Sequence, residues 1–320
     1  MPGRLRGTSQ EPVNTRPITP ATLKTSVIAA PPLARKADLS VNFEENRKII
    51  RYLEEAGLST LLYSANANFY HVGLGEYASI LEFLEETVAA NTLVLPAIGP
   101  AFGTMIAQAR MLRKTRFPAA MLLPANFAAN SEGIERGIRR LIDELGKPVI
   151  IELNQPDAME VADVHRLVRD GLVAAVIYSV RTNEPAEDPY LTRLTDRIDP
   201  LTFISGSGEY AAITHMRDFG MGTFVSSCVC VAPRLARKMH RAIQDRDFDI
   251  AGNVRELFLP LDRLMQRYHP VRVVHESVHL ARIADSGALL PFLSNLERDQ
   301  QRGVLNSVQQ LMVDNVNFGV

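Results

Sequence analysis

Residues 148–180 read PVIIELNQPDAMEVADVHRLVRDGLVAAVIYSV. Two apolar runs, at 148–154 and 173–180, enclose a segment, 162–170, whose apolar residues recur at helical spacing. Continuous apolar runs of this length are typical of strands buried on both faces of a parallel sheet. The stretch therefore predicts a strand–helix–strand unit, the building block of an α/β fold.

The same unit repeats in both directions along the chain. Each predicted strand is followed by a helical pattern, and eight such units fit into roughly 220 residues, which indicates a closed (β/α)8 barrel, the TIM barrel of the α/β class. The predicted strands lie at 24–32, 59–66, 92–99, 119–125, 148–154, 173–180, 201–207 and 223–231. After residue 233 only helices are predicted. The expected domains are a disordered or loosely attached tail at 1–20, a barrel at 21–245 and a helical extension at 246–320.

Composition restricts the classes of function. The 320 residues are 46% hydrophobic and carry a formal net charge of −1. No basic excess exists to attract nucleic acid or an anionic membrane, so neither is an expected partner. No apolar run approaches the roughly 18 residues of a membrane helix, and residues 1–20 lack the apolar region of a signal peptide. With only two cysteines, Cys228 and Cys230, we expect a cytoplasmic protein without a disulfide framework.

Barrel enzymes carry their chemistry at the carboxyl ends of the strands. The predicted strand ends are rich in neutral hydrogen-bonding side chains and poor in charge, which suits a small polar or anionic ligand such as a carboxylic acid. The candidate binding residues are Ser64, Asn66, Asn68, Asn154, Arg181, Ser205 and Glu209, and the candidate catalytic residues are Tyr178 and Asn126. The asparagines also suit turns, because Asn tolerates left-handed backbone. Glu209 also suits the start of a helix.

The order of these elements resembles the dihydrodipicolinate synthase / N-acetylneuraminate lyase family. The resemblance runs from about Thr22 to Leu311. Residues 26–31 resemble the first strand of the family, 152–156 its Leu-Tyr-Asn-x-Pro segment, and 203–208 its seventh strand. It implies a TIM barrel with C-terminal helices. It also implies a homo-oligomer, since family members commonly form tetramers of tight dimers.

The family forms a Schiff base on a lysine of the sixth strand, and this chain departs from that pattern. Tyr178 stands at the lysine position. Asn126 stands where the family has its catalytic tyrosine, or Ala125 or Phe127 does if the alignment shifts by one residue. The carboxylate-binding Gly-Thr-Thr-Gly-Glu loop aligns with 64–68 or with 72–76, and both threonines are missing either way. Since imine formation requires an amine nucleophile, the sequence predicts a lyase-superfamily enzyme that acts on a small oxo or hydroxy acid without Schiff-base chemistry. A non-catalytic homologue, which binds a small molecule or partners an active paralogue, is the alternative.

Tyr178 is expected to point into the barrel with Val176, because alternate residues of a strand share a face. In that position the Tyr178 phenol would either act as an acid or base or fill the space that the lysine of the family occupies. The pocket around it is expected to be neutral to cationic. Glu152, inside the fifth predicted strand, needs a partner. It would pair within the barrel or point to the helix layer.

Two further sequence features bear on metal binding and on assembly. His275-Glu-Ser-Val-His279 has the letters of a zinc motif, but it lies in the helical extension, where a packing helix explains it. We expect no metal and no cofactor. The apolar loop at 69–77 is too apolar for a solvated loop, which supports a homodimer or homotetramer.

Overall fold

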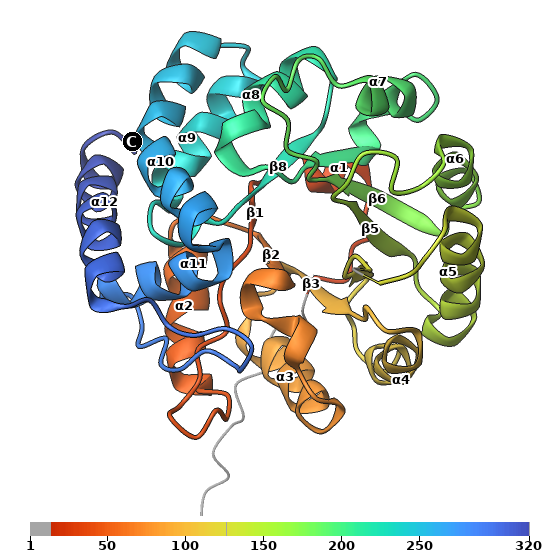
Figure 1. The fold of residues 1–320 in the computed structure, drawn as a ribbon, viewed down its shortest axis with the longest axis horizontal. Coiled ribbons are helices and arrows are strands. Elements are labelled where there is room, and N and C mark those ends of the chain that lie inside the picture. Colours follow the sequence, from red (N-terminus) through yellow and green to blue (C-terminus); the bar gives the residue numbers. More distant parts are fainter. Residues whose placement is uncertain (1–13, 126, 320) are drawn as a thin grey trace, which may run out of the picture.

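The computed structural model describes residues 14–125 and 127–319. Their eight strands are all parallel and follow the chain order around a closed barrel, in which β8 pairs with both β7 and β1. The predicted TIM barrel is therefore confirmed (Figure 1). The strands are β1 (Ile28–Ala29), β2 (Thr60–Tyr63), β3 (Leu93–Ile98), β4 (Ala120–Leu122), β5 (Val149–Leu153), β6 (Val173–Tyr178), β7 (Phe203–Ser205) and β8 (Thr223–Ser226).

A helix follows every strand and covers the outside of the barrel. Local sequence explains where these helices begin and end. The Asn130 side chain accepts a hydrogen bond from Gly133 N at the start of α5, and Gly146 ends that helix with a φ of 68°. Pro189 and Pro233 occupy the first turns of α7 and α9, where the missing N–H costs nothing. The helices of the barrel are α1 (Pro20–Leu23), α2 (Phe43–Glu55), α3 (Leu74–Thr87), α4 (Phe102–Leu112), α5 (Ser131–Leu145), α6 (Val161–Arg169), α7 (Pro189–Thr195), α8 (Gly208–Asp218) and α9 (Pro233–Gln244).

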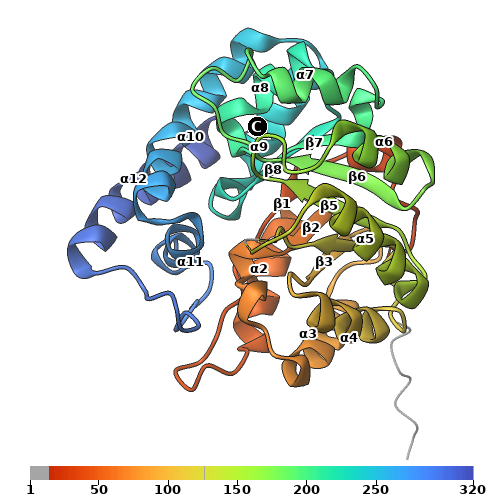
Figure 2. The same ribbon diagram turned by 45° about the vertical axis from the view of Figure 1, so that its right-hand side comes forward.

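Three C-terminal helices, α10 (Phe248–Tyr268), α11 (Pro270–Leu280) and α12 (Arg298–Asn317), lie on one side of the barrel. The long α10 packs against α8 and α9, and α11 and α12 pack against α10 (Figure 2). Among the described residues, no helix combines the length and the apolar character needed to span a bilayer.

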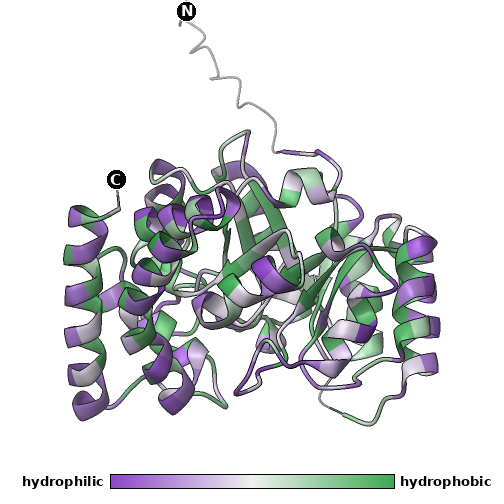
Figure 3. Cartoon of the chain, turned by 90° about the horizontal axis from the view of Figure 1, so that it is seen from above, coloured by the Kyte–Doolittle hydropathy of each residue, from purple (hydrophilic) through white to green (hydrophobic). Residues whose placement is uncertain are grey.

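Hydropathy follows this layering. The strands at the centre are hydrophobic, whereas the surrounding helices carry both hydrophobic and hydrophilic faces (Figure 3). One continuous core joins both faces of the strands to the inner faces of the helices. Helices α5 and α9 have a hydrophobic face and a hydrophilic face along their whole length. Packing of the hydrophobic face against the sheet, rather than intrinsic helix propensity, therefore supplies most of their stability.

Two segments differ from the sequence-based prediction. The eighth strand ends at Ser226, and the two cysteines lie in a 3-10 turn, η4 (Cys228–Cys230), so the prediction of a strand to residue 231 is wrong. Both cysteines are buried and free. The apolar loop after β2 packs within its own chain, because Phe69, Val72 and Tyr77 are buried and Leu74 is its only exposed large hydrophobic residue. Its apolar character is thus no argument for an interface.

The predicted N-terminal tail falls partly outside the described residues, which begin at 14. Within the described part, Ile18 is buried, and Asn14 Nδ2 donates a 3.2 Å hydrogen bond to Asn91 O. Residues 14–19 therefore contact the barrel before α1 begins.

Candidate functional site

The strand register decides which side chains enter the barrel. Glu152 pairs with Ile177, and Ile177 pairs with Ile204, so these three side chains share one face of the sheet. Alternation along the strands puts Tyr178 and Ser205 on the opposite face. That face contacts the outer helices through Tyr178, which bonds Asp188 at the start of α7, and through Ser205, which lies 2.9 Å from His215 on α8, so the face of Glu152 is inside the barrel.

Tyr178 contacts the helix layer, so the prediction that it points into the barrel is wrong. Its hydroxyl donates a 2.6 Å hydrogen bond to Asp188 Oδ2, at the N-cap of α7. The ring lies about 6 Å from those of Tyr190 on α7 and His215 on α8. Burial, followed by the bond to Asp188, raises the pKa of Tyr178 far above its ordinary value. Both faces of this strand are apolar, so its pattern did not indicate which face is inside.

Ser205 has the same orientation as Tyr178. Its hydroxyl lies 2.9 Å from Nδ1 of His215, and both residues are fully buried. Burial lowers the pKa of His215 to about 4, so the ring is neutral at pH 7. Tyr178 and Ser205 therefore join the barrel to its helices rather than line its mouth.

Glu152 is an ionisable group that the fold places at the barrel mouth. Ser179 Oγ donates a 2.6 Å hydrogen bond to Glu152 Oε1. Burial raises the pKa of Glu152 above its ordinary value, and the hydrogen bond from Ser179 opposes part of that rise. The charge of Glu152 also contributes, after burial, to a raised pKa of Tyr70, which lies in the loop after β2. A carboxyl group with a raised pKa is suited to proton transfer near neutral pH.

A cavity of about 780 Å³ opens beside Glu152. It lies between the carboxyl ends of β4 and β5 and the helices α4 and α5, and most of its wall is apolar. Among the described residues that line it, Glu152 is the only ionisable one, and Asn130, Asn154 and Gln155 supply amides. The expected neutral-to-cationic pocket is thus replaced by one whose single ionisable group is an acid.

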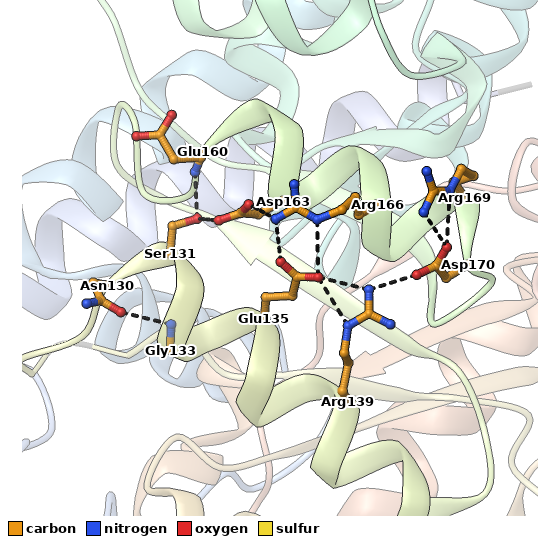
Figure 4. Close-up of polar contacts among 10 residues, drawn as sticks. All are labelled: Asn130, Ser131, Gly133, Glu135, Arg139, Glu160, Asp163, Arg166, Arg169 and Asp170. Atoms are coloured by element: carbon orange, nitrogen blue, oxygen red, sulfur yellow. Dashed lines mark hydrogen bonds and ion pairs between the residues drawn. The ribbon is translucent and has the colours of Figure 1, made fainter.

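The wall of this cavity is held in place by polar contacts between α5 and α6. Arg166 Nη2 donates to Glu135 Oε2 at 2.7 Å and also to Asp163 Oδ1. Ser131 Oγ donates to Asp163 and accepts a 2.8 Å hydrogen bond from the backbone of Glu160 (Figure 4). These bonds fix the first turn of α5, which faces the cavity.

The candidate residues after β2 form a separate cluster. Asn66 Nδ2 donates to Ala30 O at 3.0 Å and to Ser227 Oγ at 2.8 Å. Asn68 adopts the left-handed conformation with a φ of 57°, and its buried Nδ2 has no partner within the described residues. Ser64 accepts backbone hydrogen bonds from this turn through its carbonyl oxygen. These residues shape the loop and do not line the cavity.

Arg181 and Glu209 form a third group, close to α10. Arg181 Nη2 pairs with Asp262 Oδ2 at 2.7 Å, and its guanidinium lies 4.3 Å from the centre of the Tyr210 ring. Glu209 is buried and accepts a hydrogen bond from Ser226 Oγ. Burial raises its pKa to about 7. Neither residue lines the cavity.

The structure thus brings only Asn154, of the residues predicted as a site, to the cavity beside Glu152. Asn126 lies outside the described residues. The signal for Glu152 was present in the sequence, because a carboxylate within an apolar strand requires a specific environment. Whether the Glu152 side chain points into the barrel or toward the helix layer depends on the strand register.

No lysine occupies the inward positions at the end of β6, which are Ile177 and Ser179. Lys147 lies at the start of β5, where its Nζ donates to Leu112 O and Thr115 O. This is the opposite end of the barrel from the cavity.

The residues of the zinc-like motif serve packing. His275 is buried, and its Nε2 atom lies 3.1 Å from Gly287 O. His279 is exposed and pairs with Asp285. Within the part of the chain that the structure describes, no group of three His, Cys, Asp or Glu side chains is arranged to hold a metal.

No protein-family model matches the chain. It is 24% identical over 284 residues to the 4-hydroxy-tetrahydrodipicolinate synthase of Desulforamulus reducens, covering 86% of this chain and 94% of the relative.

Two solved structures share the fold over nearly their whole length. Dihydrodipicolinate synthase from Bacillus clausii has a TM-score of 0.81 at 19% identity, covering 91% of this chain and 98% of that chain. Sialic acid aldolase from Ruminococcus gnavus has a TM-score of 0.81 at 13% identity, covering 93% and 100%. These curated and structural neighbours are members of the dihydrodipicolinate synthase / N-acetylneuraminate lyase family, which confirms the resemblance seen in the sequence.

Proposed function

We propose that this protein is a lyase-superfamily enzyme that acts on a small oxo or hydroxy acid by acid–base catalysis at Glu152, without a Schiff base. One observation carries the proposal: the Glu152 carboxyl, hydrogen-bonded to Ser179 and raised in pKa, lies at the barrel mouth beside a cavity of about 780 Å³. The carboxyl ends of the strands are where barrel enzymes place their chemistry.

In the proposed reaction, the Glu152 carboxylate takes a proton from the carbon next to the substrate carbonyl. The electron pair of that C–H bond forms an enolate, whose oxygen is within reach of amide donors such as Asn154 on the cavity wall. Glu152 then returns its proton to the carbon, or to a hydroxyl group that leaves as water. The first outcome restores the substrate and the second releases water and an unsaturated acid, and neither needs an added reactant.

The inner face of β6 supports a mechanism without an imine. Ile177 and Ser179 stand where a Schiff-base lysine would have to project into the barrel, and neither can form an imine. Ser179 instead contributes a hydrogen bond that holds the Glu152 carboxyl in one orientation.

The cavity wall favours a ligand with a substantial apolar part and one acidic end. No cation is present among the described lining residues, so a substrate carboxylate would be received by amides and by the N-terminus of α5. Asn130 and Gly133 place that helix end on the wall. We therefore expect the cavity to discriminate between ligands by their shape more than by their charge.

The proposal is tested by deuterium exchange. The protein is incubated in D₂O with a panel of 2-oxo and 2-hydroxy acids, and loss of the proton next to the carbonyl is followed by proton NMR. We expect exchange with at least one acid, lost by about a hundredfold or more in Glu152→Gln. Glu44→Gln, an exposed acid in the first turn of α2, away from the cavity, is the matched control and should exchange normally.

A binding protein without turnover is the second candidate, and the largely apolar wall of the cavity favours it. The same samples distinguish the two. Saturation-transfer NMR signals from a panel acid, without exchange in the unmodified protein, would support binding alone and contradict the catalytic proposal.

A further inference from the structure

A second cavity lies at the opposite end of the barrel, where the strands begin. It has a volume of about 360 Å³ and shares no residue with the cavity beside Glu152. Its wall is formed by the connection from α1 to β1, the turn after α2 and the last turns of α9. Neither the resemblance in the sequence nor the proposed reaction uses this end of the barrel.

Three cations line this second cavity: Lys24, Arg237 and Arg241. No carboxylate is present among the described residues of its wall. The chain as a whole carries a net charge of only −1, so the three cations are a local concentration of positive charge. A concave surface of one sign attracts a ligand of the opposite sign.

The cations differ in how they are held. Arg237 Nη1 donates a 2.6 Å hydrogen bond to Ala56 O, which anchors its guanidinium at the end of α2. Gly57 permits this, because a β-carbon there would lie 2.6 Å from Nη1. Lys24 and Arg241 are exposed and have no hydrogen bond or ion pair from their side chains within residues 14–125 and 127–319. Their charges are available to a ligand.

The wall also contains a buried polar group without a partner. His240 lies one residue before Arg241 on α9, and its side chain is mostly buried. Within the described residues its Nε2 has no hydrogen-bond partner. Burial lowers the pKa of His240 to about 4, so the ring is neutral at pH 7 and adds no charge. A ligand oxygen that reached the imidazole would satisfy this group.

We propose that this cavity binds a small dianion, a phosphate or a dicarboxylate, held between Lys24 and Arg241. Its volume corresponds to about twelve water molecules, which fits a ligand of a few heavy atoms. Ion pairs from Lys24 on one side and Arg241 on the other would link the α1–β1 connection to α9. Binding would therefore stabilise the folded protein by mass action.

The experiment measures binding of inorganic phosphate and of succinate to the whole protein, by calorimetry and by thermal unfolding, with ionic strength matched by KCl. We expect at least one dianion to bind and to raise Tm. Lys24→Gln and Arg241→Gln should each weaken binding by about tenfold, the effect of losing one charge-assisted contact. Both side chains are exposed, so neither change threatens folding.

Lys114→Gln is the matched control. Lys114 is also exposed, lies at the same end of the barrel between α4 and β4, and has no side-chain partner among the described residues. It should bind like the unmodified protein. Binding of phosphate alone identifies a phosphoryl site, and binding of succinate alone identifies a dicarboxylate site. The proposal is overturned if neither dianion binds beyond the KCl control, or if Lys114→Gln weakens binding as much as Lys24→Gln.

Discussion

Ser179 Oγ donates its hydrogen bond to Glu152 Oε1 across two neighbouring strands, at 2.6 Å. The bond joins the end of β6 to the interior of β5, where burial alone would favour the protonated acid. A serine in this position keeps the carboxyl group usable as a base, because the hydrogen bond favours its charged form.

Replacing this serine should change the titration of Glu152. In Ser179→Ala the pKa of Glu152 rises further, since a hydrogen bond to the carboxylate is lost. Carboxyl carbon NMR measures the titration, and the acidic limb of any exchange activity should move to higher pH with it. An unchanged titration, or an equal change in Ser79→Ala on the exposed face of α3, would contradict this assignment.

Glu209 should make stability depend on pH between its unfolded and folded pKa values. Its pKa rises from 4.5 to about 7 on burial. Below pH 4.5 both states hold the proton, so its contribution to folding is fully present there; it is lost as the pH rises toward 7 and stays absent above. Glu209→Gln should therefore gain stability relative to the unmodified protein at pH 8, by up to roughly 3 kcal/mol, with little difference at pH 4.

Urea unfolding of both proteins across this range measures the difference. The comparison has to be made between variants, because buried neutral histidines such as His215 and His240 act in the opposite direction, losing stability as the pH falls. A constant difference at all pH values would show that Glu209 does not titrate in this window.

Tyr178→Phe should reduce stability without changing the cavity. The variant loses the hydrogen bond to the buried Asp188 at the start of α7, which costs about 1–3 kcal/mol in urea unfolding. Tyr178 does not line the cavity. Binding of any acid found there should stay within experimental error, and a weakened affinity would show that the phenol contributes to recognition.

The ion pairs between α5 and α6 should matter more than those on the surface of α5. Arg166→Met leaves Glu135 and Asp163, both mostly buried, without a shared partner, and should lower the free energy of unfolding measurably. Arg140→Met removes only long, exposed contacts to Asp143 and Glu144 and should cost less than about 0.5 kcal/mol. Equal losses in urea unfolding would contradict this difference.

A homodimer or homotetramer stays a prediction, now with a different structural reason. Val313, Val316 and Phe318, in and just after α12, are more than half exposed, and an apolar surface of this kind favours association. Light scattering should give a multiple of 35.5 kDa. Val316→Glu should lower that mass if α12 forms the contact, whereas a mass of 35.5 kDa for the unmodified protein would refute the prediction.

Local sequence patterns are sufficient to specify the architecture. Eight apolar runs, each followed by an amphipathic helix, leave a closed parallel barrel as the arrangement that buries both faces of every strand, and the order of the elements already resembled the lyase family. The sequence also located the carboxyl end of β5 to within one residue, which placed Asn154 near the cavity. These features depend on local patterns, which the sequence carries directly.

Which side chains face the barrel interior depends on the strand register, which is set by the folded structure and not by local sequence. In β6 both faces are apolar, and a shift of one residue exchanges Tyr178 for Ser179 at the mouth. The closed register resolves this choice, because pairing with β5 and β7 forces Ile177 inward beside Glu152. The role of Arg181 also depends on the tertiary structure, because its partner Asp262 lies 81 residues further along the chain. Contacts over such separations arise from the packing of whole helices, which no local pattern encodes.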